Sequence, residues 1–444
     1  MPYKLFDYQI EYGINYLRRV NGRGALWWDM RLRKTLPVIR FFSQRKDARR
    51  KLIFGPYSVL PEWEEQLRND DIKNIFPIYK VKTGKERTEF LKQLHNENSI
   101  GWFLVNCESP VHINIFCYGW DLIAADESTF LANPKAQITK QFLMNAKSKY
   151  FVALSGTPRS ESELQYFVPL HIINREILGY SNFWEYRAAR FQVIGHDFCM
   201  PVRHKLWLAS RLNKFCSVLK REDVGMKKER VEISRYFELP SDARELYDRI
   251  EQDAMLWGDI LKFAGQRWNM LRRICGGFND SGTVIHWEKM RLLTGLLDGE
   301  FKGKRLVIWA WYKSEVEKIA AWLKCPFIHG EIDSMKRNDI RLRFNNGKYQ
   351  YLVAEPACWR FGTSLKNVDA VIFYSRPLSN LTNTQVSART EDLGTEDATL
   401  LVDLICKDSV EEDIIASLKA KESKEQLMER IRRGVQLRRN KIKV

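Results

Sequence analysis

Short apolar runs alternate along the first half of the chain with longer stretches in which apolar residues recur every three or four positions. The runs are residues 25–28, 51–54, 101–106, 122–125 and 150–154, and the longer stretches include 61–69 and 85–96. Short runs rich in β-branched and aromatic residues are typical of buried strands, and the longer spacing is typical of amphipathic helices. Strands that alternate with helices predict a parallel sheet covered by helices on both faces.

The same alternation returns in the second half of the chain. Runs at 306–310, 351–354, 370–374 and 399–403 predict further strands, with a helix at 314–323 among them. The segment between the two halves, about 175–295, is richer in helical patterns. An extended stretch at 231–239 ends at Pro240, and we expect the boundary between the two halves there.

The length also supports two domains. A single hydrophobic core stops growing at about 250 to 300 residues, so 444 residues suit two domains of about 200 residues each. The predicted fold class is α/β, with two tandem lobes at residues 1–240 and 241–444 that each contain a parallel sheet. A helical insertion at 241–300 opens the second lobe.

The chain is strongly basic. Its 72 Lys and Arg residues against 55 Asp and Glu residues give a formal net charge of +17. A positive surface favours a polyanionic partner, because contacts with phosphates release counterions. A membrane surface is the rival, but the sequence has neither a long apolar run nor a basic amphipathic stretch with a clean apolar face. Nucleic acid is therefore the predicted partner, and no membrane is expected.

The N-terminus and the cysteines bear on the compartment. Residues 1–15 lack the apolar segment of a signal peptide, and none of the eight cysteines forms a Cys-x-x-Cys pair. These features predict a cytoplasmic protein without a disulfide framework or a zinc ribbon. His196, Cys199 and His204 do not have a standard zinc spacing, so we expect them to be structural.

Residues Arg31 to Thr35 follow the predicted strand 25–28 and open a helix. Such a junction directs backbone N–H groups and the positive helix end at an anion. There, Lys34 can contact terminal phosphates and Thr35 can ligate Mg²⁺. The usual phosphate loop has glycine before the lysine, whereas Arg33 stands there here. The pattern alone therefore leaves a phosphate loop and an ordinary turn both open.

A pair of carboxylates, Asp126 and Glu127, ends the apolar run 122–125. Ligands gather at the carboxyl ends of strands in a parallel sheet. Asp126 is a candidate ligand for Mg²⁺, and Glu127 is a candidate base that polarises an attacking water. The alternative is a loop with two solvated acids.

Ser155, Gly156, Thr157 and Pro158 follow the predicted strand 150–154. Turn chemistry alone would explain these residue types. However, this segment, the carboxylate pair and the Lys34 loop each end a strand of one predicted sheet. All three should therefore lie on the same sheet edge.

These motifs, in this order, resemble those of Swi/Snf-type members of helicase superfamily two, and the resemblance extends over almost the whole chain. It includes Leu5 to Gln9 at the start, Phe54 to Pro56 with Trp63, and Asn133 to Lys135 after the carboxylate pair. The resemblance implies two RecA-like lobes, ATP and Mg²⁺ as cofactors, and Gln9 as the residue that recognises adenine. It implies that Arg33, Lys34 and Thr35 bind nucleotide and that Ser155 and Thr157 couple the nucleotide to nucleic acid.

The second half continues the resemblance. Its matching segments are Leu219 to Val224, Arg305 to Trp309, His329 to Glu331, Gly362 with Leu365, and Gln385 with Arg389 and Gly394. The resemblance implies that Gly362 takes part in coupling. It implies that Arg389, which matches the first of two motif arginines, is catalytic, and that the second arginine stabilises charge on the transferring phosphoryl group.

The chain departs from the family pattern at the phosphate site. Arg31 and Arg33 replace two glycines, Arg360 replaces another, and Asp392 stands where a second arginine is expected. A non-glycine residue in a left-handed conformation costs about 1–2 kcal/mol, so the loop either bears that strain or is reshaped. An arginine finger contributes about 10³–10⁵ in rate, so we expect weak hydrolysis unless another arginine, Arg360 or Arg376, substitutes.

The C-terminal segment 430–444 is a predicted basic tail. Arg430, Arg432 and Arg433 are its first cations, and no acidic residue occurs in it. It should contact phosphates without discriminating sequence, and the alternative is a solvated terminus without a dedicated role.

The resemblance implies an ATP hydrolase that moves along duplex DNA, and the net positive charge agrees with such a partner. One alternative is a nucleotide-sensing DNA-binding module that has lost hydrolysis, and another is an RNA helicase of the same superfamily. A non-enzymatic scaffold would require every phosphate-site residue to be structural. The compact size favours a bacterial or phage origin.

Overall fold

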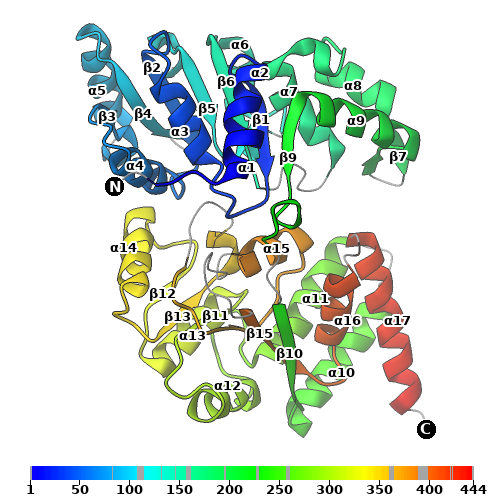
Figure 1. Cartoon of the computed structure of the whole chain (residues 1–444). Coiled ribbons are helices and arrows are strands. Elements are labelled where there is room, and N and C mark those ends of the chain that lie inside the picture. Colours follow the sequence, from blue (N-terminus) through cyan, green and yellow to red (C-terminus); the bar gives the residue numbers. More distant parts are fainter. Residues whose placement is uncertain are drawn as a thin grey trace. The chain divides into compact units, whose positions relative to one another are not determined.

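The structure is a computed structural model. It describes residues 3–82, 84–107, 115–131, 133–145, 147–156, 162–194, 197–226, 230–256, 261–359, 365–388, 399–420, 422 and 424–442. The described residues divide into two units, the first at 3–226 and the second from 230 onward (Figure 1). The division falls before the expected boundary at 240. The reason is that the extended stretch there is a strand, β10 (Arg230–Phe237), which pairs in parallel with β15 (Thr399–Cys406) of the second sheet.

The first unit contains a sheet of seven parallel strands in the order β3-β4-β2-β5-β6-β1-β9. The strands are β1 (Arg23–Trp28), β2 (Arg50–Gly55), β3 (Ile75–Phe76), β4 (Gly101–Asn106), β5 (Leu122–Ala125), β6 (Tyr150–Leu154) and β9 (Cys216–Leu219). Because all of them run the same way, their carboxyl ends share one edge. The order β5-β6-β1 brings the three predicted motif loops together at that edge.

Both faces of this sheet are buried. In β1, Ala25 and Trp27 pack into one core cluster, and Leu26 and Trp28 pack into another on the opposite face. Burial on both faces explains why the strands are continuous apolar runs and not alternating ones.

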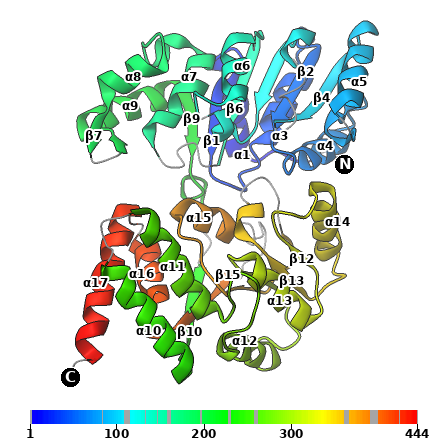
Figure 2. The same cartoon turned by 180° about the vertical axis from the view of Figure 1, so that it is seen from behind.

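Helices cover both faces of the sheet in the first unit (Figures 1 and 2). They are α1 (Asp7–Gln9), α2 (Tyr16–Arg19), α3 (Thr35–Ser43), α4 (Leu60–Asn69), α5 (Gly84–Asn96), α6 (Gln137–Asn145), α7 (Phe167–Ile173), α8 (Phe183–Arg190) and α9 (Val202–Phe215). A π-helical turn, η1 (Ile10–Asn15), joins α1 to α2. An antiparallel pair, β7 (Gln192–Ile194) and β8 (Asp197–Cys199), lies with α8 and α9 at the end of the unit opposite α5.

The second unit contains a sheet of six parallel strands in the order β10-β15-β14-β11-β13-β12. Besides β10 and β15, the strands are β11 (Leu306–Trp309), β12 (Phe327–Ile328), β13 (Tyr351–Ala354) and β14 (Ala370–Phe373). The helices are α10 (Ser241–Leu256), α11 (Leu261–Gly276), α12 (Glu288–Asp298), α13 (Lys313–Leu323), α14 (Ser334–Asn345), α15 (Asn380–Ala388), α16 (Val410–Ala420) and α17 (Lys424–Ile442). Two parallel sheets flanked by helices confirm the predicted α/β fold class.

The C-terminal segment is a packed helix up to Ile442 and not an extended tail. Leu427, Ile431 and Val435 of α17 are buried, and their spacing of four residues places them on one helix face. Arg438 forms ion pairs of 2.9 Å with both Glu251 of α10 and Asp413 of α16. The sequence shows a run of cations there, but every fourth residue is apolar and anchors the helix.

Candidate active site

The loop between β1 and α3 keeps a glycine-like backbone although it carries two arginines. Arg31 has a φ of 72° and Arg33 has a φ of 49°, so both adopt the left-handed conformation that favours glycine. Each non-glycine residue in this conformation costs about 1–2 kcal/mol. Of the two expectations, strain and a reshaped loop, the structure shows strain.

Side chains from the N-terminal segment hold this loop. The Tyr8 hydroxyl donates to the Leu32 carbonyl at 3.2 Å, and the Gln9 amide donates to the carbonyls of Leu32 and Arg33 at 3.3 and 3.1 Å. The Gln9 amide oxygen accepts a hydrogen bond from the Phe6 N–H at 3.0 Å. Gln9 is fully buried, so in this structure it braces the loop, and its role in recognising adenine stays a prediction.

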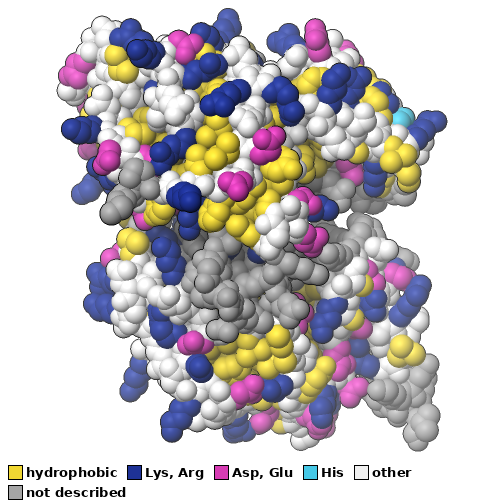
Figure 3. Space-filling view, viewed as in Figure 1, with side chains coloured by type: hydrophobic (Ala, Val, Ile, Leu, Met, Phe, Trp, Pro, Cys, Tyr) yellow, Lys and Arg dark blue, Asp and Glu magenta, His cyan; other side chains and the backbone are white. Residues whose placement is uncertain are grey.

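The segment that carries Gln9 also presents an apolar surface. Phe6, Ile10 and Tyr12 are 45%, 40% and 48% exposed, and hydrophobic side chains gather over α1 and α2 in Figure 3. The Phe6 ring stacks on the Tyr8 ring, with 5.6 Å between their centroids. An exposed aromatic ring therefore lies beside the residues that brace the loop between β1 and α3.

Lys34 and Thr35 stand at the start of α3, where backbone N–H groups favour an anion. The Lys34 ammonium is partly exposed and has no hydrogen bond or ion pair with any residue that the structure describes. The Thr35 hydroxyl donates its proton to the Gln66 side-chain oxygen. This bond leaves the lone pairs of the hydroxyl for a cation, which suits the predicted role of Thr35 as a ligand of Mg²⁺.

Asp126 and Glu127 are both only 4% exposed, which argues against two solvated acids in a loop. One carboxylate oxygen of Asp126 accepts a hydrogen bond from the Trp63 indole N–H at 2.7 Å, and the other accepts one from the Glu127 N–H at 2.8 Å. These two donors fix the plane of the carboxylate. Each oxygen keeps a second lone pair that can bind a divalent cation, so the donor set fits Mg²⁺.

Glu127 links two of the predicted motif loops. It has a φ of 48°, a third non-glycine residue in the left-handed conformation at this sheet edge. Its carboxylate accepts a long hydrogen bond of 3.5 Å from the hydroxyl of the buried Ser155, after β6.

The loop between β1 and α3 contacts the loop after β6. A Cβ atom at Gly156 would lie 2.7 Å from the Met30 side chain, so only glycine fits where these two loops meet. Asp126, Glu127, Ser155 and the loop around Met30 therefore form one connected edge, as the order of the strands requires.

Trp63 and Gln66 contact the predicted site residues, although no role was predicted for either of them. They lie three positions apart on α4, so both side chains lie on the same face of the helix. One contacts Asp126 and the other contacts Thr35. The signals were the place of Trp63 in the family resemblance and the spacing on a predicted helix, and neither specifies which loop that face meets.

Several predicted residues lie outside the described part of the chain. These are Thr157, Arg360, Gly362, Arg389 and Asp392. Their proposed roles stay predictions.

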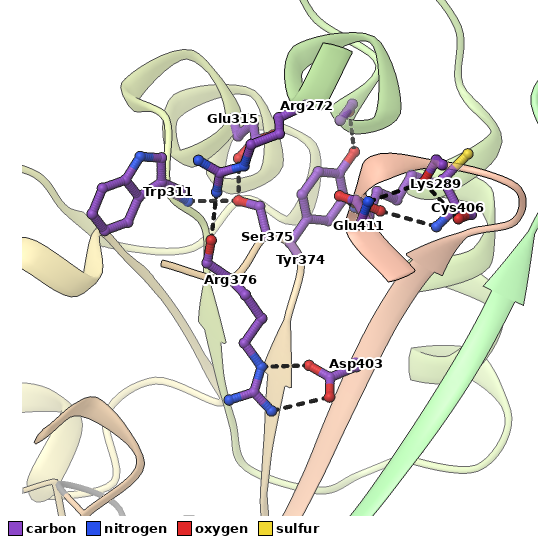
Figure 4. A network of polar contacts seen from close by, with 12 residues as sticks. Arg272, Lys289, Trp311, Glu315, Tyr374, Ser375, Arg376, Asp403, Cys406 and Glu411 are labelled. Atoms are coloured by element: carbon purple, nitrogen blue, oxygen red, sulfur yellow. Dashed lines mark hydrogen bonds and ion pairs between the residues drawn. The ribbon is translucent and has the colours of Figure 1, made fainter. Parts of the chain in front are cut away.

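The carboxyl-end edge of the second sheet carries a buried polar network (Figure 4). The Arg376 guanidinium forms a bidentate pair with Asp403 at 2.6 and 3.0 Å and donates to the Asn383 side chain of α15 at 2.5 Å. The guanidinium carbon of Arg376 lies 3.5 Å from the centroid of the Phe373 ring. Arg376 is therefore held in place, which argues against the expectation that it substitutes for a missing arginine finger.

The network continues across the sheet edge. The Glu315 carboxylate accepts a hydrogen bond from Ser375, and burial raises the pKa of Glu315. Lys289, which is fully buried, pairs with Glu411 at 2.6 Å (Figure 4). The hydrogen bond connects the end of β14 to α13, and the ion pair connects α12 to α16. The sequence did not predict them because the partners lie far apart along the chain.

Besides Arg438, the predicted C-terminal cations Arg430 and Arg433 have acidic partners. Arg430 forms an ion pair with Glu422, and Arg433 forms one with Glu429 at 3.0 Å. Exposed pairs of this kind contribute only about 0–1 kcal/mol, so they can exchange for phosphate contacts. The role of Arg430, Arg432 and Arg433 in binding nucleic acid stays a prediction.

The fold and the site define a class: two-lobed α/β proteins with a nucleotide-type loop and a buried carboxylate pair on one sheet edge. Residues 8–267 match the SNF2-related domain, and residues 288–394 match the helicase conserved C-terminal domain. Because the first match covers more than half of the chain, the protein belongs to the SNF2-related family and is a Swi/Snf-type, helicase-like ATPase core with two RecA-like lobes.

Individual relatives are distant. The chain is 23% identical over 469 residues to the CHD3-type chromatin-remodeling factor CHR7 of Arabidopsis thaliana, covering 94% of this chain and 37% of that protein. It is 26% identical over 121 residues to DEAD-box ATP-dependent RNA helicase 53 of Oryza sativa subsp. japonica, covering 26% of this chain and 20% of the helicase. The chain thus spans little more than a third, or less, of the length of these relatives.

A solved structure of similar extent is the Sulfolobus solfataricus SWI2/SNF2 ATPase core in complex with dsDNA. It is 20% identical, with a TM-score of 0.44, and the match covers 95% of this chain and 92% of that one. Across the residues that the structure describes, no helix combines the length and the apolar content needed to cross a membrane.

Proposed function

We propose that the protein is a nucleic-acid-stimulated ATPase that couples hydrolysis to movement along duplex DNA. The observation that carries the proposal is the arrangement of residues at the carboxyl-end edge of the first sheet. There, a strained loop held by Gln9 precedes Lys34 and Thr35, and two strands away the buried pair Asp126 and Glu127 is linked to Ser155. The family and the charge of +17 support DNA as the track.

Each residue has a distinct task in the proposed reaction. Lys34 and the N–H groups at the start of α3 hold the phosphates, and Thr35 with Asp126 holds Mg²⁺. Mg²⁺, when bound, neutralises charge on the phosphate oxygens. The Glu127 carboxylate orients the attacking water and accepts its proton, and Ser155 links that carboxylate to the loop after β6.

We propose that Arg389, which matches the first of the two motif arginines, contributes positive charge at the phosphates. Asp392 stands where a second arginine is expected, so turnover should be slow compared with that of an enzyme with an intact finger. Two guanidinium groups in the phosphate loop, from Arg31 and Arg33, add positive charge near the phosphates and support binding.

The direct test is the rate of ATP hydrolysis with and without duplex DNA. We expect DNA to raise the rate of the unmodified protein, and Glu127→Gln to lower the stimulated rate by about 10²-fold or more, because it removes a general base. Lys34→Ala should abolish ATP binding in calorimetry. A stimulated rate no higher than that of Glu127→Gln would end the proposal.

A nucleotide-sensing module without hydrolysis is a second candidate. The strain at Arg31 and Arg33 and the presence of Asp392 favour it. This candidate predicts ATP-dependent changes in DNA affinity without phosphate release. An RNA helicase would instead separate RNA duplexes, so strand-separation assays on RNA and DNA distinguish it from a DNA translocase.

A further inference from the structure

An aromatic platform with two cations lies on the surface of the first unit. It consists of the rings of Trp184 and Phe198, which are 48% and 37% exposed, together with Arg187 and Lys135. The Arg187 guanidinium carbon lies 4.7 Å from the Trp184 centroid and 4.2 Å from the Phe198 centroid. The Lys135 ammonium lies 5.6 Å from the Trp184 centroid.

Three separate segments build the platform. Trp184 and Arg187 are on α8, whose first turn is capped by Asn182 accepting hydrogen bonds from two backbone N–H groups at 3.0 Å. Phe198 is on β8. Lys135 comes from the connection that follows the Asp126 and Glu127 pair, and its N–H donates to the Asn133 side chain at 3.0 Å. The platform is thus joined by a short connection to the edge that carries the carboxylates.

The two cations of the platform have no acidic partner among the described residues. Neither Lys135 nor Arg187 forms an ion pair with an acid in the part of the chain that the structure describes. The nearby Glu185 carboxylate instead accepts hydrogen bonds from the Ser181 N–H and the Asn182 amide. Between residues 183 and 215 the sequence has six Lys and Arg residues against two acidic ones. The acids are Glu185 and Asp197, and the cations are Arg187, Arg190, Arg203, Lys205, Arg211 and Lys214.

We propose that this platform binds the sugar–phosphate backbone of DNA. Rings at Trp184 and Phe198 restrict the Arg187 guanidinium, so less side-chain entropy is lost when its N–H groups bind a phosphate. The exposed ring area covers apolar sugar surface, and Lys135 adds a second cation. Such contacts position DNA without selecting its sequence. The inference rests on the proposed function only for the class of partner and adds a site away from the nucleotide.

The test is the salt dependence of binding to duplex DNA, measured by fluorescence anisotropy with the full chain. The double variant Lys135→Ala with Arg187→Ala should bind more weakly, and the slope of log affinity against log salt should decrease by about 1.8, or about 0.9 for each lost phosphate contact. Lys92→Ala is the matched control. It removes one exposed cation on α5, at the other end of the same unit, and should leave the slope unchanged.

A charge-neutral variant tests the aromatic part. Trp184→Leu should weaken DNA binding while it leaves the salt slope unchanged, because it removes ring surface and no cation. A double variant with the affinity and slope of Lys92→Ala would overturn the platform and would point to a protein partner for this surface. If the unmodified protein binds no duplex DNA, the proposed function fails as well, so the two failures are distinct.

Discussion

The carboxyl-end edges of the two sheets differ in how they treat polar groups. At the first edge, three non-glycine residues, Arg31, Arg33 and Glu127, have left-handed backbones. The Lys34 ammonium there has no partner among the described residues. At the second edge, two buried ion pairs join neighbouring elements: Arg376 pairs with Asp403, and Lys289 pairs with Glu411.

This difference agrees with the proposal that the first edge binds nucleotide and the second edge supports the fold. Strained residues persist only where their surroundings hold them, and they cluster at functional sites. In the first unit, hydrogen bonds from Tyr8 and Gln9 hold the strained loop, and the Lys34 ammonium is available to bind an anion. In the second unit, Arg376 contacts both Asp403 of β15 and Asn383 of α15. The helix α15 leads to the predicted Arg389. The variants below test each half of the comparison.

The largest effect is expected in the second unit. Asp403→Ala leaves the buried Arg376 without its bidentate partner, so we expect the free energy of unfolding of this unit to decrease by about 3–5 kcal/mol. Hydrogen exchange should show the loss of protection in β14 and β15 and not in β1 and β6. Replacing both partners, Arg376→Met with Asp403→Leu, should recover most of the stability. Equal destabilisation by both changes would show that the ion pair is not what matters.

The next effect concerns the first edge. Trp63→Phe removes the indole N–H that fixes the Asp126 carboxylate, so we expect the Mg²⁺ concentration for half-maximal ATPase rate to increase about 10–100-fold. Binding of ATP without Mg²⁺ should change little.

Trp120→Phe is the control for this variant. Trp120 is also buried, and its indole donates to the Ile115 carbonyl at 2.7 Å, but it precedes β5 and so lies at the opposite sheet edge. The same increase in Trp120→Phe would mean that lost packing and not the lost hydrogen bond weakens metal binding.

The strands and the first edge could be predicted because their signals are local. Strands buried on both faces are continuous apolar runs, and Lys34, Asp126 and Ser155 each follow one. The backbone of Arg31 and Arg33 could not be predicted, because it depends on hydrogen bonds from Tyr8 and Gln9.

The boundary between the lobes illustrates the same limit. Residues 230–237 have an extended pattern, but their partner β15 begins at Thr399, far along the chain. The pairing, and not the pattern, assigns β10 to the second sheet. The ion pairs of Arg376 and Lys289 were missed for the same reason.

A smaller effect is expected from relieving strain in the phosphate loop. Arg33→Gly removes a left-handed cost of about 1–2 kcal/mol but adds about 0.5–1 kcal/mol of unfolded-state entropy, so we expect a net stabilisation of about 0.5–1 kcal/mol. Arg33→Ala removes the same guanidinium and keeps the strain. Thermal unfolding should therefore give a higher Tm for the glycine variant than for the alanine variant, and the reverse order would show that the loop is not strained in solution.

The smallest effect on stability is expected at α17. Deleting residues 430–444 would confuse two roles, because it also removes the buried Ile431 and Val435 and the paired Arg438. Changing Arg430, Arg432 and Arg433 to Gln removes only exposed or half-buried cations, so the free energy of unfolding should decrease by no more than about 1 kcal/mol.

The same triple variant separates the two roles predicted for the C-terminal cations. If they contact phosphates, the salt slope of DNA binding should decrease by up to about 2.7, because each lost contact contributes about 0.9. In the absence of DNA, Arg430 and Arg433 would then pair with Glu422 and Glu429, and DNA phosphates would replace these partners. An unchanged slope would instead show that α17 serves only to pack against α16 through Leu427, Ile431 and Val435, and the DNA surface would be confined to other elements.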